Sequence, residues 1–591
     1  MARQNGPVQS LTGTAASSGI ARGPWILVAP EPPPAGGRID PGQAEGEIAR
    51  LAAAAEAAAG DLERLAERVS SSGHPDEGAI FDAQAAMARD PALATLSAER
   101  IRERGEDAIA ATLGAAGELA DQLRALGDEL LAARAADLID VAARVARHLA
   151  GRPEADVPRL DEAAIVVAHD LAPSLAATLP RQRLLGLALE AGSKTAHAAI
   201  LARAYGIPAV VGVAGLLVAL ADAAAGAHLE GRAPVLAIDG DSGEVFIDPD
   251  VAVAERLASR AAAADAAASR GLAEAALPAV TRDGVEVFLL ANIGTPDEAA
   301  RSVALGARGV GLFRTEFLFL ERATPPSEDE QLDAYRRVVA AFAPHPVTIR
   351  LLDVGGDKPI PYLPIEPEAN PFLGVRALRL AAVRPEVFVT QLRAAYRAAA
   401  HGQVKVMAPM IADATDAATL LELAERARAG LEADGIAHGE VALGVMLEIP
   451  SAILVADSYF GRIAFGSLGT NDLLQYTLAV DRGNPQLERY QDSLHPALLG
   501  LVARSVEAAE RAGIELSVCG EMAGDATAAL ALVGLGITRL SMSAGSLPEV
   551  RRTIRGSDFA EMRMAAGEAL REPSAVAVRA RFEALRAGAL A

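Results

Sequence analysis

The chain has 591 residues, of which 51% are hydrophobic and 22% are charged, and its formal net charge at pH 7 is −22. This length allows about three or four domains with sizeable apolar cores. The acidic balance argues against nucleic acid as the main partner; it is compatible with a basic protein partner, although solubility alone explains it more simply.

The N-terminal quarter predicts the start of an α/β domain followed by an inserted helical bundle. The first residues, MARQNGPVQS, lack the apolar core of a signal peptide, and residues 1–6 are expected to form a loose tail. Residues 19–30 contain a predicted strand. Asp40 and Pro41 are typical of a helix N-cap followed by proline. Over residues 41–155 apolar residues recur at helical spacing, which predicts a bundle for packing or docking, since no chemistry is visible in it.

Residues 156–250, together with residues 7–40, are expected to form the α/β domain. Its predicted strands lie at 163–170, 184–192, 208–213 and 235–249, the last of them a hairpin. The uncharged, largely apolar run at residues 207–221 is interrupted by proline and glycine and is short for a membrane span. It predicts a strand followed by a helix, and no membrane insertion. Residues 251–280 predict a charged, alanine-rich linker helix.

His197 lies in the segment AGSKTAHAAILARAYGIPAVVG of this α/β domain. A strand is expected to end near Glu190, residues 192–196 to form a turn, and a helix to run from His197 to Gly206. The N-terminus of a helix favours a neutral imidazole and stabilises a phosphate attached to it. For a lone histidine, a purely structural role is the more common alternative.

From residue 281 to about residue 580 a strand-then-helix rhythm repeats about eight times, which predicts a TIM (β/α)₈ barrel. The predicted strands lie at 285–294, 309–316, 347–356, 404–411, 441–450, 463–472, 515–523 and 539–546. Each segment begins apolar and ends polar. The polar residues at these ends are Asn292, Arg314, Arg350, Glu448, Asn471, Asp472 and Cys519. Barrel active sites are built at the carboxyl ends of the strands, so we expect these side chains to share one site.

The predicted barrel mouth combines several guanidinium groups with two carboxylates. Its arginines are Arg314, Arg350, Arg376 and Arg482, and its carboxylates are Glu448 and Asp472. The arginines favour a small polyanion, and the carboxylates suit Mg²⁺ completed by substrate oxygens and water. The segment GTNDLLQYTLAVDRGNP adds Asn471 beside Asp472, an amide and a carboxylate that suit a phosphate oxygen and a hard cation. Zinc, Walker and Rossmann motifs are absent from the sequence, so a small anion with phosphate and carboxylate groups fits best.

Cys519 is the single cysteine of the chain, which excludes an internal disulfide and fits a reducing, cytoplasmic compartment. It follows the seventh predicted barrel strand, in the segment SVCGEMAG. A thiol in this position can be a nucleophile, a proton donor or an inert buried group. The neighbouring motifs offer no histidine base, which weakens the hypothesis of a nucleophile.

Seven segments of the C-terminal half resemble, in order, the barrel motifs of one known family. They are GVGLFRTEFLFLER, IRLLDVGGDKPIPYL, NPFLGVRALR, GVMLEIPSA, GTNDLLQYTLAVDRGN, CGEMAGD and LSMSAGSLP. The family is Enzyme I of the bacterial phosphotransferase system, the phosphoenolpyruvate-protein phosphotransferases. The resemblance covers nearly the whole chain.

The resemblance implies a mobile α/β domain with a phosphorylated histidine, a helical domain that docks the phosphocarrier protein HPr, and a homodimeric barrel that binds phosphoenolpyruvate with Mg²⁺. It implies that His197 takes the phosphoryl group and passes it to HPr, in the first step of sugar uptake, while pyruvate is released. Cys519 is then the proton donor. The implied substrate ligands are Arg314, Arg350, Asn471 and Arg482, with Arg376 added from its place at the mouth, and the implied metal ligands are Glu448 and Asp472.

The chain departs from the family pattern in two places. Where the family usually reads Gly-Gly-Arg-Thr-Ser-His, this chain has Ser193, Lys194 and Ala196, which bears on the tuning of His197 more than on its identity. Gln84 stands where the family commonly has histidine, which bears on the docking surface. The alternative function is that of a regulatory, nitrogen-type paralogue that phosphorylates a different carrier protein. A binding protein with an inactive site fits less well, because the barrel motifs are complete.

Overall fold

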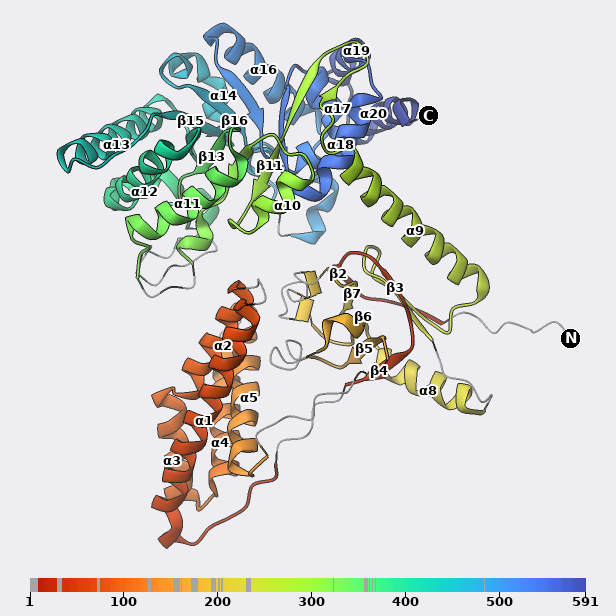
Figure 1. The fold of residues 1–591 in the computed structure, drawn as a ribbon, viewed down its shortest axis with the longest axis vertical. Coiled ribbons are helices and arrows are strands. Elements are labelled where there is room, and N and C mark those ends of the chain that lie inside the picture. The colour runs from red at the N-terminus through yellow and green to blue at the C-terminus, as the bar shows by residue number, and fades with distance from the viewer. Residues whose placement is uncertain are drawn as a thin grey trace, which may run out of the picture. The chain divides into compact units, whose positions relative to one another are not determined.

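The computed structural model divides the chain into two units, Met1–Asp265 and Ala266–Ala591, each of which is described by itself (Figure 1). The structure describes residues 9–28, 34–71, 75–125, 129–152, 160, 162–171, 179–192, 198–199, 202–203, 206–229, 235–320, 322, 324–355, 360, 362–363, 365–366, 368–482 and 484–590. His197 and the departures at Ser193, Lys194 and Ala196 lie outside the described residues.

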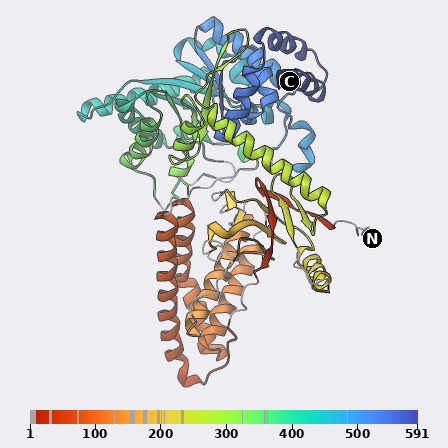
Figure 2. The same ribbon diagram turned by 45° about the vertical axis from the view of Figure 1, so that its right-hand side comes forward.

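The predicted helical insertion is present in the first unit, where long helices pack side by side (Figures 1 and 2). These helices are α1 (Ala44–Ser71), α2 (Pro75–Ala88), α3 (Pro91–Arg104), α4 (Ala108–Ala125) and α5 (Glu129–Leu149). A short turn, Pro41–Gln43, precedes them, and the Gln43 side chain accepts a hydrogen bond from Asp40 N at 3.1 Å. Alanines fill much of the core, and their small side chains let neighbouring helices approach closely.

The α/β part of the first unit contains two sheets rather than one. The four-stranded sheet has the order β1-β9-β8-β3, and the five-stranded sheet has the order β2-β7-β6-β5-β4. The strands are β1 (Gln9–Thr12), β2 (Thr14–Ser17), β3 (Ile20–Gly23), β4 (Trp25–Leu27), β5 (Ala164–Ala168), β6 (Leu184–Leu189), β7 (Ala209–Val211), β8 (Leu236–Asp239) and β9 (Glu244–Ile247), with helix α8 (Leu216–Leu229) after β7. The predicted hairpin is β8–β9.

The N-terminal segment differs from its prediction. Residues 19–30 were expected to contain one strand, but the chain forms β3, crosses to the other sheet at Pro24 and continues as β4. Proline has no N–H for a strand ladder, which suits it to this crossing. Strands β1 and β2 were not predicted, because these four-residue strands lack a long apolar run and form by pairing with the distant β9 and β7.

Helix α9 (Val251–Ala273) follows the α/β part. The linker helix was predicted over residues 251–280, and α9 ends before the last of these residues. Residues 279–280 instead form strand β10 (Ala279–Val280), which pairs antiparallel with the first strand of the barrel. Pro278 immediately precedes this pairing, so the chain leaves the helical conformation before it.

The second unit contains the predicted (β/α)₈ barrel. Parallel pairing runs from β11 to β18, and β18 also pairs with β11, which closes the sheet. The strands are β11 (Glu286–Ile293), β12 (Val310–Phe313), β13 (Val347–Arg350), β14 (Val404–Ala408), β15 (Val441–Leu447), β16 (Phe465–Leu468), β17 (Glu515–Val518) and β18 (Arg539–Met542). The parallel strands all end on the same side, so the residues that follow them meet there.

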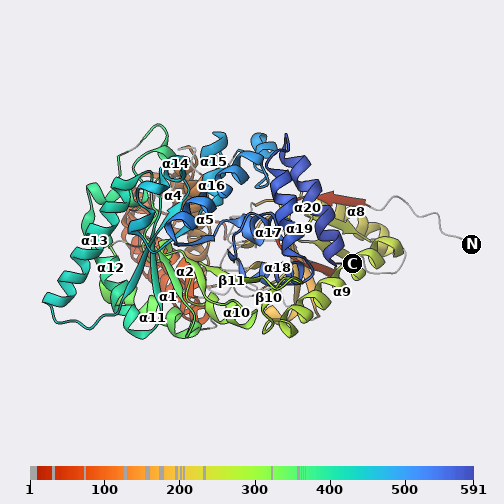
Figure 3. The same ribbon diagram turned by 90° about the horizontal axis from the view of Figure 1, so that it is seen from above.

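Helices surround these strands, as Figure 3 shows. They are α10 (Glu298–Ala304), α11 (Glu328–Phe342), α12 (Pro385–Ala398), α13 (Ala414–Ala433), α14 (Pro450–Leu454), α15 (Thr470–Leu478), α16 (Pro496–Ala512), α17 (Ala526–Gly534), α18 (Leu547–Arg555), α19 (Phe559–Ala569) and α20 (Ala575–Leu590). In the part of the chain that the structure describes, no helix has the length and apolarity that a membrane span requires.

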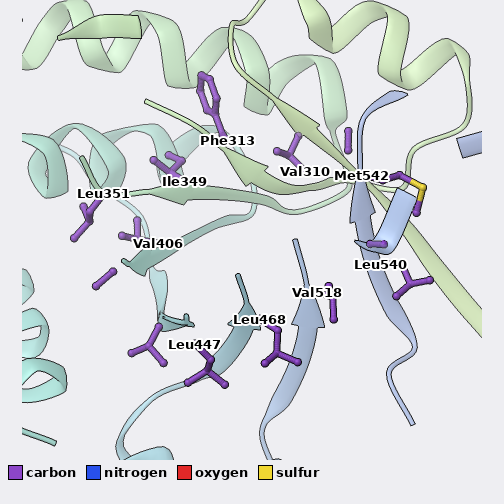
Figure 4. Packing of buried hydrophobic residues seen from close by; sticks show 14 of the residues in the cluster. Val310, Phe313, Ile349, Leu351, Val406, Leu447, Leu468, Val518, Leu540 and Met542 are labelled. Atoms are coloured by element: carbon purple, nitrogen blue, oxygen red, sulfur yellow. The ribbon is translucent and has the colours of Figure 1, made fainter. Parts of the chain in front are cut away.

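Alternate side chains of the barrel strands enter two different cores, as the period of two along a strand requires. The large core between strands and helices includes Phe313, Val406, Leu447 and Val518 (Figure 4). The small core inside the barrel consists of Leu312, Met407, Met446, Phe465 and Cys519. Cys519 therefore belongs to the barrel interior, where it packs with the apolar side chains of this small core.

Candidate active site

A pocket of about 450 Å³ opens among the residues at the carboxyl ends of the barrel strands. It is lined by eight of the nine site residues predicted from the sequence, namely Arg314, Arg350, Arg376, Glu448, Asn471, Asp472, Arg482 and Cys519. The ninth, His197, lies outside the described residues. Segments that are far apart in the sequence thus meet in one place.

Asn292 also ends a barrel strand, but it faces its neighbours rather than the pocket. Its Nδ2 donates to Cys519 O at 2.9 Å, and its Oδ1 accepts from Ser541 Oγ at 2.6 Å. These bonds join β11 to Cys519, which follows β17, and to Ser541 within β18. Asn292 therefore supports the backbone at Cys519.

Arg350, the last residue of β13, is buried between two carboxylates. Its Nη2 donates to Glu316 Oε1 at 2.7 Å, and its Nη1 lies 3.3 Å from Asp353 Oδ2. Burial lowers the pKa of Arg350, but the carboxylates, Glu316 first, more than offset this, so the net shift of the pKa is upward. A buried charge needs such partners. The guanidinium is consequently held in one orientation before any ligand arrives.

Arg376 is the second arginine that a carboxylate holds. Its Nε donates to Asp353 Oδ1 at 3.2 Å and its Nη2 to Asp353 Oδ2 at 2.9 Å, in the two-point geometry that suits a guanidinium. Its Nη1 donates to Tyr476 OH at 3.3 Å, and Tyr476 in turn donates to Phe372 O at 2.6 Å. Gly355, with φ +117°, allows this arrangement, because a Cβ there would lie 2.7 Å from Arg376 Cβ.

Arg314 and Arg482 are less engaged than the other two arginines. Arg314 is exposed, and its side chain has no hydrogen bond or ion pair to another described residue. The Arg482 side chain is 50% exposed, and its Nη1 lies 3.8 Å from Asp472 Oδ1, beyond hydrogen-bond distance. Two guanidinium groups at the pocket are thus available to an incoming anion.

Glu448 and Asp472 form a carboxylate pair that fits a divalent cation. Glu448 Oε1 accepts from Met410 N at 2.5 Å, and burial, together with Asp353 and Asp472, raises the pKa of Glu448 to about 8. Asp472 Oδ1 is buried and has no hydrogen-bond donor among the described residues. Among those residues, no cluster of three or more His, Cys, Asp or Glu side chains is arranged for a metal. Mg²⁺ would therefore need oxygens from substrate and water, which it readily accepts.

Cys519 lies at the floor of the pocket with only 2% of its surface exposed. Its Sγ donates to Leu468 O at 3.6 Å. Burial raises the pKa of the thiol to about 11, with a smaller upward contribution from the nearby Glu448 carboxylate and lowering contributions from Ser467 and the arginines. The thiol is therefore protonated at neutral pH. This environment disfavours a thiolate nucleophile and suits a group that gives up a proton.

Comparison with known proteins identifies the family. Residues 269–559 match the model of the PEP-binding domain of PEP-utilising enzymes, residues 12–134 the N-terminal domain, and residues 160–243 the mobile domain. A phosphoenolpyruvate-protein phosphotransferase of Streptomyces coelicolor is 43% identical over 98% of this chain and 99% of its own length. One from Listeria innocua is 37% identical over 96% of this chain and 97% of its own.

The chain belongs to the phosphoenolpyruvate-protein phosphotransferase family. Among solved structures, the solution structure of an Enzyme I (nEIt) protein is 31% identical to it. That match covers 43% of this chain and 99% of the other, with a TM-score of 0.35.

Glu316 and Asp353 are pocket residues of this phosphotransferase that the sequence analysis did not select. The mouth was expected to hold two carboxylates, but among the described residues five line the pocket: Glu316, Asp353, Glu448, Asp472 and Glu521. A signal for the first two existed, because Glu316 follows Arg314 by two residues and Asp353 follows Arg350 by three, both just past a strand. A carboxylate just past a strand end is a candidate partner for a buried arginine at the same mouth, and both of these carboxylates pair with Arg350.

Asn471 and Asp472 lie in the first turn of α15 rather than at the end of the preceding strand. Asn471 Oδ1 accepts from Glu521 N at 3.1 Å, which joins this turn to the residues after Cys519. The N-terminus of a helix carries partial positive charge, so α15 adds to the attraction of the pocket for an anion.

The α/β part of this phosphotransferase carries a described hydrogen bond between two side chains close in sequence to His197. His169 and Glu190 directly follow the neighbouring parallel strands β5 and β6, and His169 Nδ1 lies 2.8 Å from Glu190 Oε2. The hydrogen bond from His169 lowers the pKa of Glu190. Ala198, next to His197 in the sequence, is helical and buried.

Gln84, the departure from the family pattern in the insertion, is a core residue. It is 1% exposed, and its Nε2 donates to Asp137 Oδ1 at 3.0 Å. This bond joins α2 to α5. The substitution therefore bears on helix packing rather than directly on an exposed docking surface.

Proposed function

We propose that this chain transfers the phosphoryl group of phosphoenolpyruvate to His197 and from there to a histidine of the phosphocarrier protein HPr, with release of pyruvate. The reaction is the first step of the sugar phosphotransferase system. The observation that carries the proposal is the convergence of Arg314, Arg482, Glu448, Asp472 and Cys519 in one pocket of a chain from this family.

The substrate fits the charge pattern of the pocket. Phosphoenolpyruvate is a small anion with a phosphate and a carboxylate, and both groups suit the planar fork of arginine. Glu316 and Asp353 already hold Arg350 and Arg376 in place, so these two side chains do not need to become ordered when the substrate binds. The guanidinium groups of Arg314 and Arg482, which are available, then donate charge-assisted hydrogen bonds to the substrate.

Glu448 and Asp472 are the residues that would hold Mg²⁺. Bound there with substrate oxygens, the ion would neutralise charge on the phosphoryl group as it is transferred. The buried Asp472 Oδ1, which has no hydrogen-bond donor among the described residues, and the pKa of Glu448, raised by burial and by neighbouring carboxylates, both support this role, because a bound cation would offset each of these costs.

Phosphoryl transfer and protonation are two steps of this reaction. A ring nitrogen of His197 attacks phosphorus, the bond from phosphorus to the enol oxygen breaks, and that oxygen keeps the electron pair as the enolate of pyruvate. The Cys519 thiol then gives its proton to the methylene carbon as the enolate collapses to the ketone, and the thiolate is reprotonated from solvent. The buried, protonated thiol supports this role.

His197 and the pocket belong to different units, so transfer requires the two to meet. Domain motions of this kind take microseconds to milliseconds or longer. The proposal also includes homodimerisation through the barrel and a cytoplasmic location. The family resemblance supports both, and the single, buried, unpaired cysteine supports the cytoplasmic location. Sedimentation velocity of the isolated protein would test the dimer.

The proposal is tested by incubation with labelled phosphoenolpyruvate and Mg²⁺, followed by mapping of acid-labile phosphate. We expect label on His197 and its transfer to HPr. His197→Ala should form no phosphoprotein yet bind phosphoenolpyruvate with nearly unchanged affinity by calorimetry, because the pocket is untouched. Label on another residue would refute the acceptor, and transfer only to a nitrogen-type carrier would favour the alternative function.

A further inference from the structure

A buried glutamine on α12, Gln391, joins the two turns that carry pocket arginines. It is 0% exposed and does not line the pocket. Its Nε2 donates to Thr315 Oγ1 at 2.9 Å, and its Oε1 accepts from Leu352 N at 2.9 Å. Thr315 lies between Arg314 and Glu316, and Leu352 lies between Arg350 and Asp353.

The hydrogen bonds of Gln391 replace strand pairing where that pairing stops. The register between β12 and β13 shifts after Val310, and Phe313 and Ile349 are the last paired residues. Beyond them, Thr315 Oγ1 donates to Arg350 O at 2.9 Å, and Gln391 bridges Thr315 to Leu352. The two turns are thus held to each other from behind the pocket.

A second helix anchors Gln391 itself. Its Nε2 also donates to Tyr335 OH of α11 at 3.2 Å, and Tyr335 OH donates to Gln331 Oε1 at 3.2 Å. Gln331 Nε2 donates to Pro326 O at 3.2 Å. Both amide donors and the amide oxygen of Gln391 are therefore used. A fully satisfied buried network of this kind specifies one geometry, and a partly satisfied one does not.

We propose that Gln391 is a positioning residue for the reaction with phosphoenolpyruvate, and this inference rests on the proposed function. Gln391 does not touch substrate. It acts through Thr315 and Leu352, which fix the backbone on which Arg314, Glu316, Arg350 and Asp353 stand. Arg314 has no partner among the described residues, so its placement depends on this backbone.

The main test compares Gln391→Leu with Thr281→Val. Gln391→Leu leaves Leu352 N without an acceptor. Thr281→Val is the matched control, because it leaves Val285 N, now bonded to Thr281 Oγ1 at 2.9 Å, without an acceptor at the start of β11. Phosphorylation of HPr, kcat and KM for phosphoenolpyruvate, and the melting temperature are measured for each.

We expect kcat/KM of Gln391→Leu to fall by about 10²-fold, the effect of a displacement of about 1 Å at reacting groups. The kcat/KM of Thr281→Val should stay within about threefold of the wild-type value, because Thr281 lies far from the pocket in the fold. Its melting temperature should fall by an amount comparable to that of Gln391→Leu. Equal kcat/KM in the two variants would overturn the inference while leaving the proposed function intact. Absence of turnover in wild type would instead refute the proposed function.

Gln391→Glu provides the pH readout and replaces Gln391→Leu if that variant does not fold. A protonated carboxyl keeps one donor for Thr315 and one acceptor for Leu352, whereas the carboxylate has no donor. Relative to wild type, kcat/KM of Gln391→Glu should therefore recover as the pH falls, by about tenfold, the equivalent of one hydrogen bond. A ratio to wild type that does not change with pH would count against a positioning role.

Discussion

The barrel mouth and the helical insertion bury polar groups very differently. The mouth gathers Arg350, Arg376, Glu316, Asp353 and Glu448 in one buried network. The insertion is filled mainly by alanine and leucine, with Gln84 and Asp137 as a buried side-chain pair. Burying charge costs folding free energy unless each group is paired, so a cluster of buried charges marks a place where chemistry rather than stability was required.

This contrast has a measurable consequence. Removal of Cys519, Glu448 or Asp472 at the mouth should alter catalysis and leave the fold nearly intact. A change of the polar pair in the insertion should alter stability and leave the chemistry of phosphoenolpyruvate intact.

The largest expected effect is that of Cys519→Ala. Loss of the proton donor should slow formation of pyruvate and phosphohistidine by about 10²–10⁴-fold, while substrate affinity is retained because the arginines are unchanged. Wild type with Mg²⁺ should exchange the methyl protons of pyruvate with D₂O, and NMR should detect no exchange in the variant. Exchange at the wild-type rate would leave Cys519 as a packing residue.

Next in size are Glu448→Ala and Asp472→Ala. Each should lower the rate of phosphoprotein formation by about 10²–10³-fold, the usual cost of removing one group that stabilises transition-state charge. Circular dichroism should show an unchanged fold. Since the role assigned to these carboxylates requires a divalent cation, full wild-type activity in the presence of a chelator would contradict it.

In the insertion, Gln84→Leu should lower the free energy of unfolding by about 1–3 kcal/mol, because it removes a donor to the buried Asp137 carboxylate. Chemical denaturation measures this loss. Gln84→His is the control, since its ring retains an N–H donor and should cost less. The rate at which the methyl protons of pyruvate exchange with D₂O should be unchanged in both variants. A fall in that rate would contradict the proposed difference between the mouth and the insertion.

The smallest expected effect is a change of folding stability with pH that comes from the single thiol, Cys519. The pKa of Cys519 in the folded protein is about 11, above its value of 9.0 in a model compound. The folded state therefore keeps a proton that the unfolded state loses, and the stability from this group declines as the pH rises from 9 through 11. The thiolate absorbance of wild type minus the absorbance of Cys519→Ala, a difference that removes the tyrosine signal, should titrate near pH 11 in the folded protein and near pH 9 in denaturant. Titration near pH 9 in both would show an exposed thiol.

Much of the barrel was predictable because its signals are local. Each strand segment is apolar and then polar, each is followed by a helical pattern, and eight such units imply closure. The carboxyl ends of parallel strands meet by geometry, so Arg314, Glu448 and Cys519 could be assigned to one pocket before their distances were known. The strands β1 and β2 were missed because four residues with a distant partner carry no comparable signal.

The sequence by itself thus determined the barrel and the chemical types gathered at its mouth, because these follow from periodicity and from the direction of the strands. Only the tertiary structure decided which arginines are held and which are open. Asp353 bridges Arg350 and Arg376, whereas Arg314 has no partner among the described residues. It also decided the state of Cys519, since the pKa of a thiol depends on burial by Leu312, Met446 and other residues from distant strands.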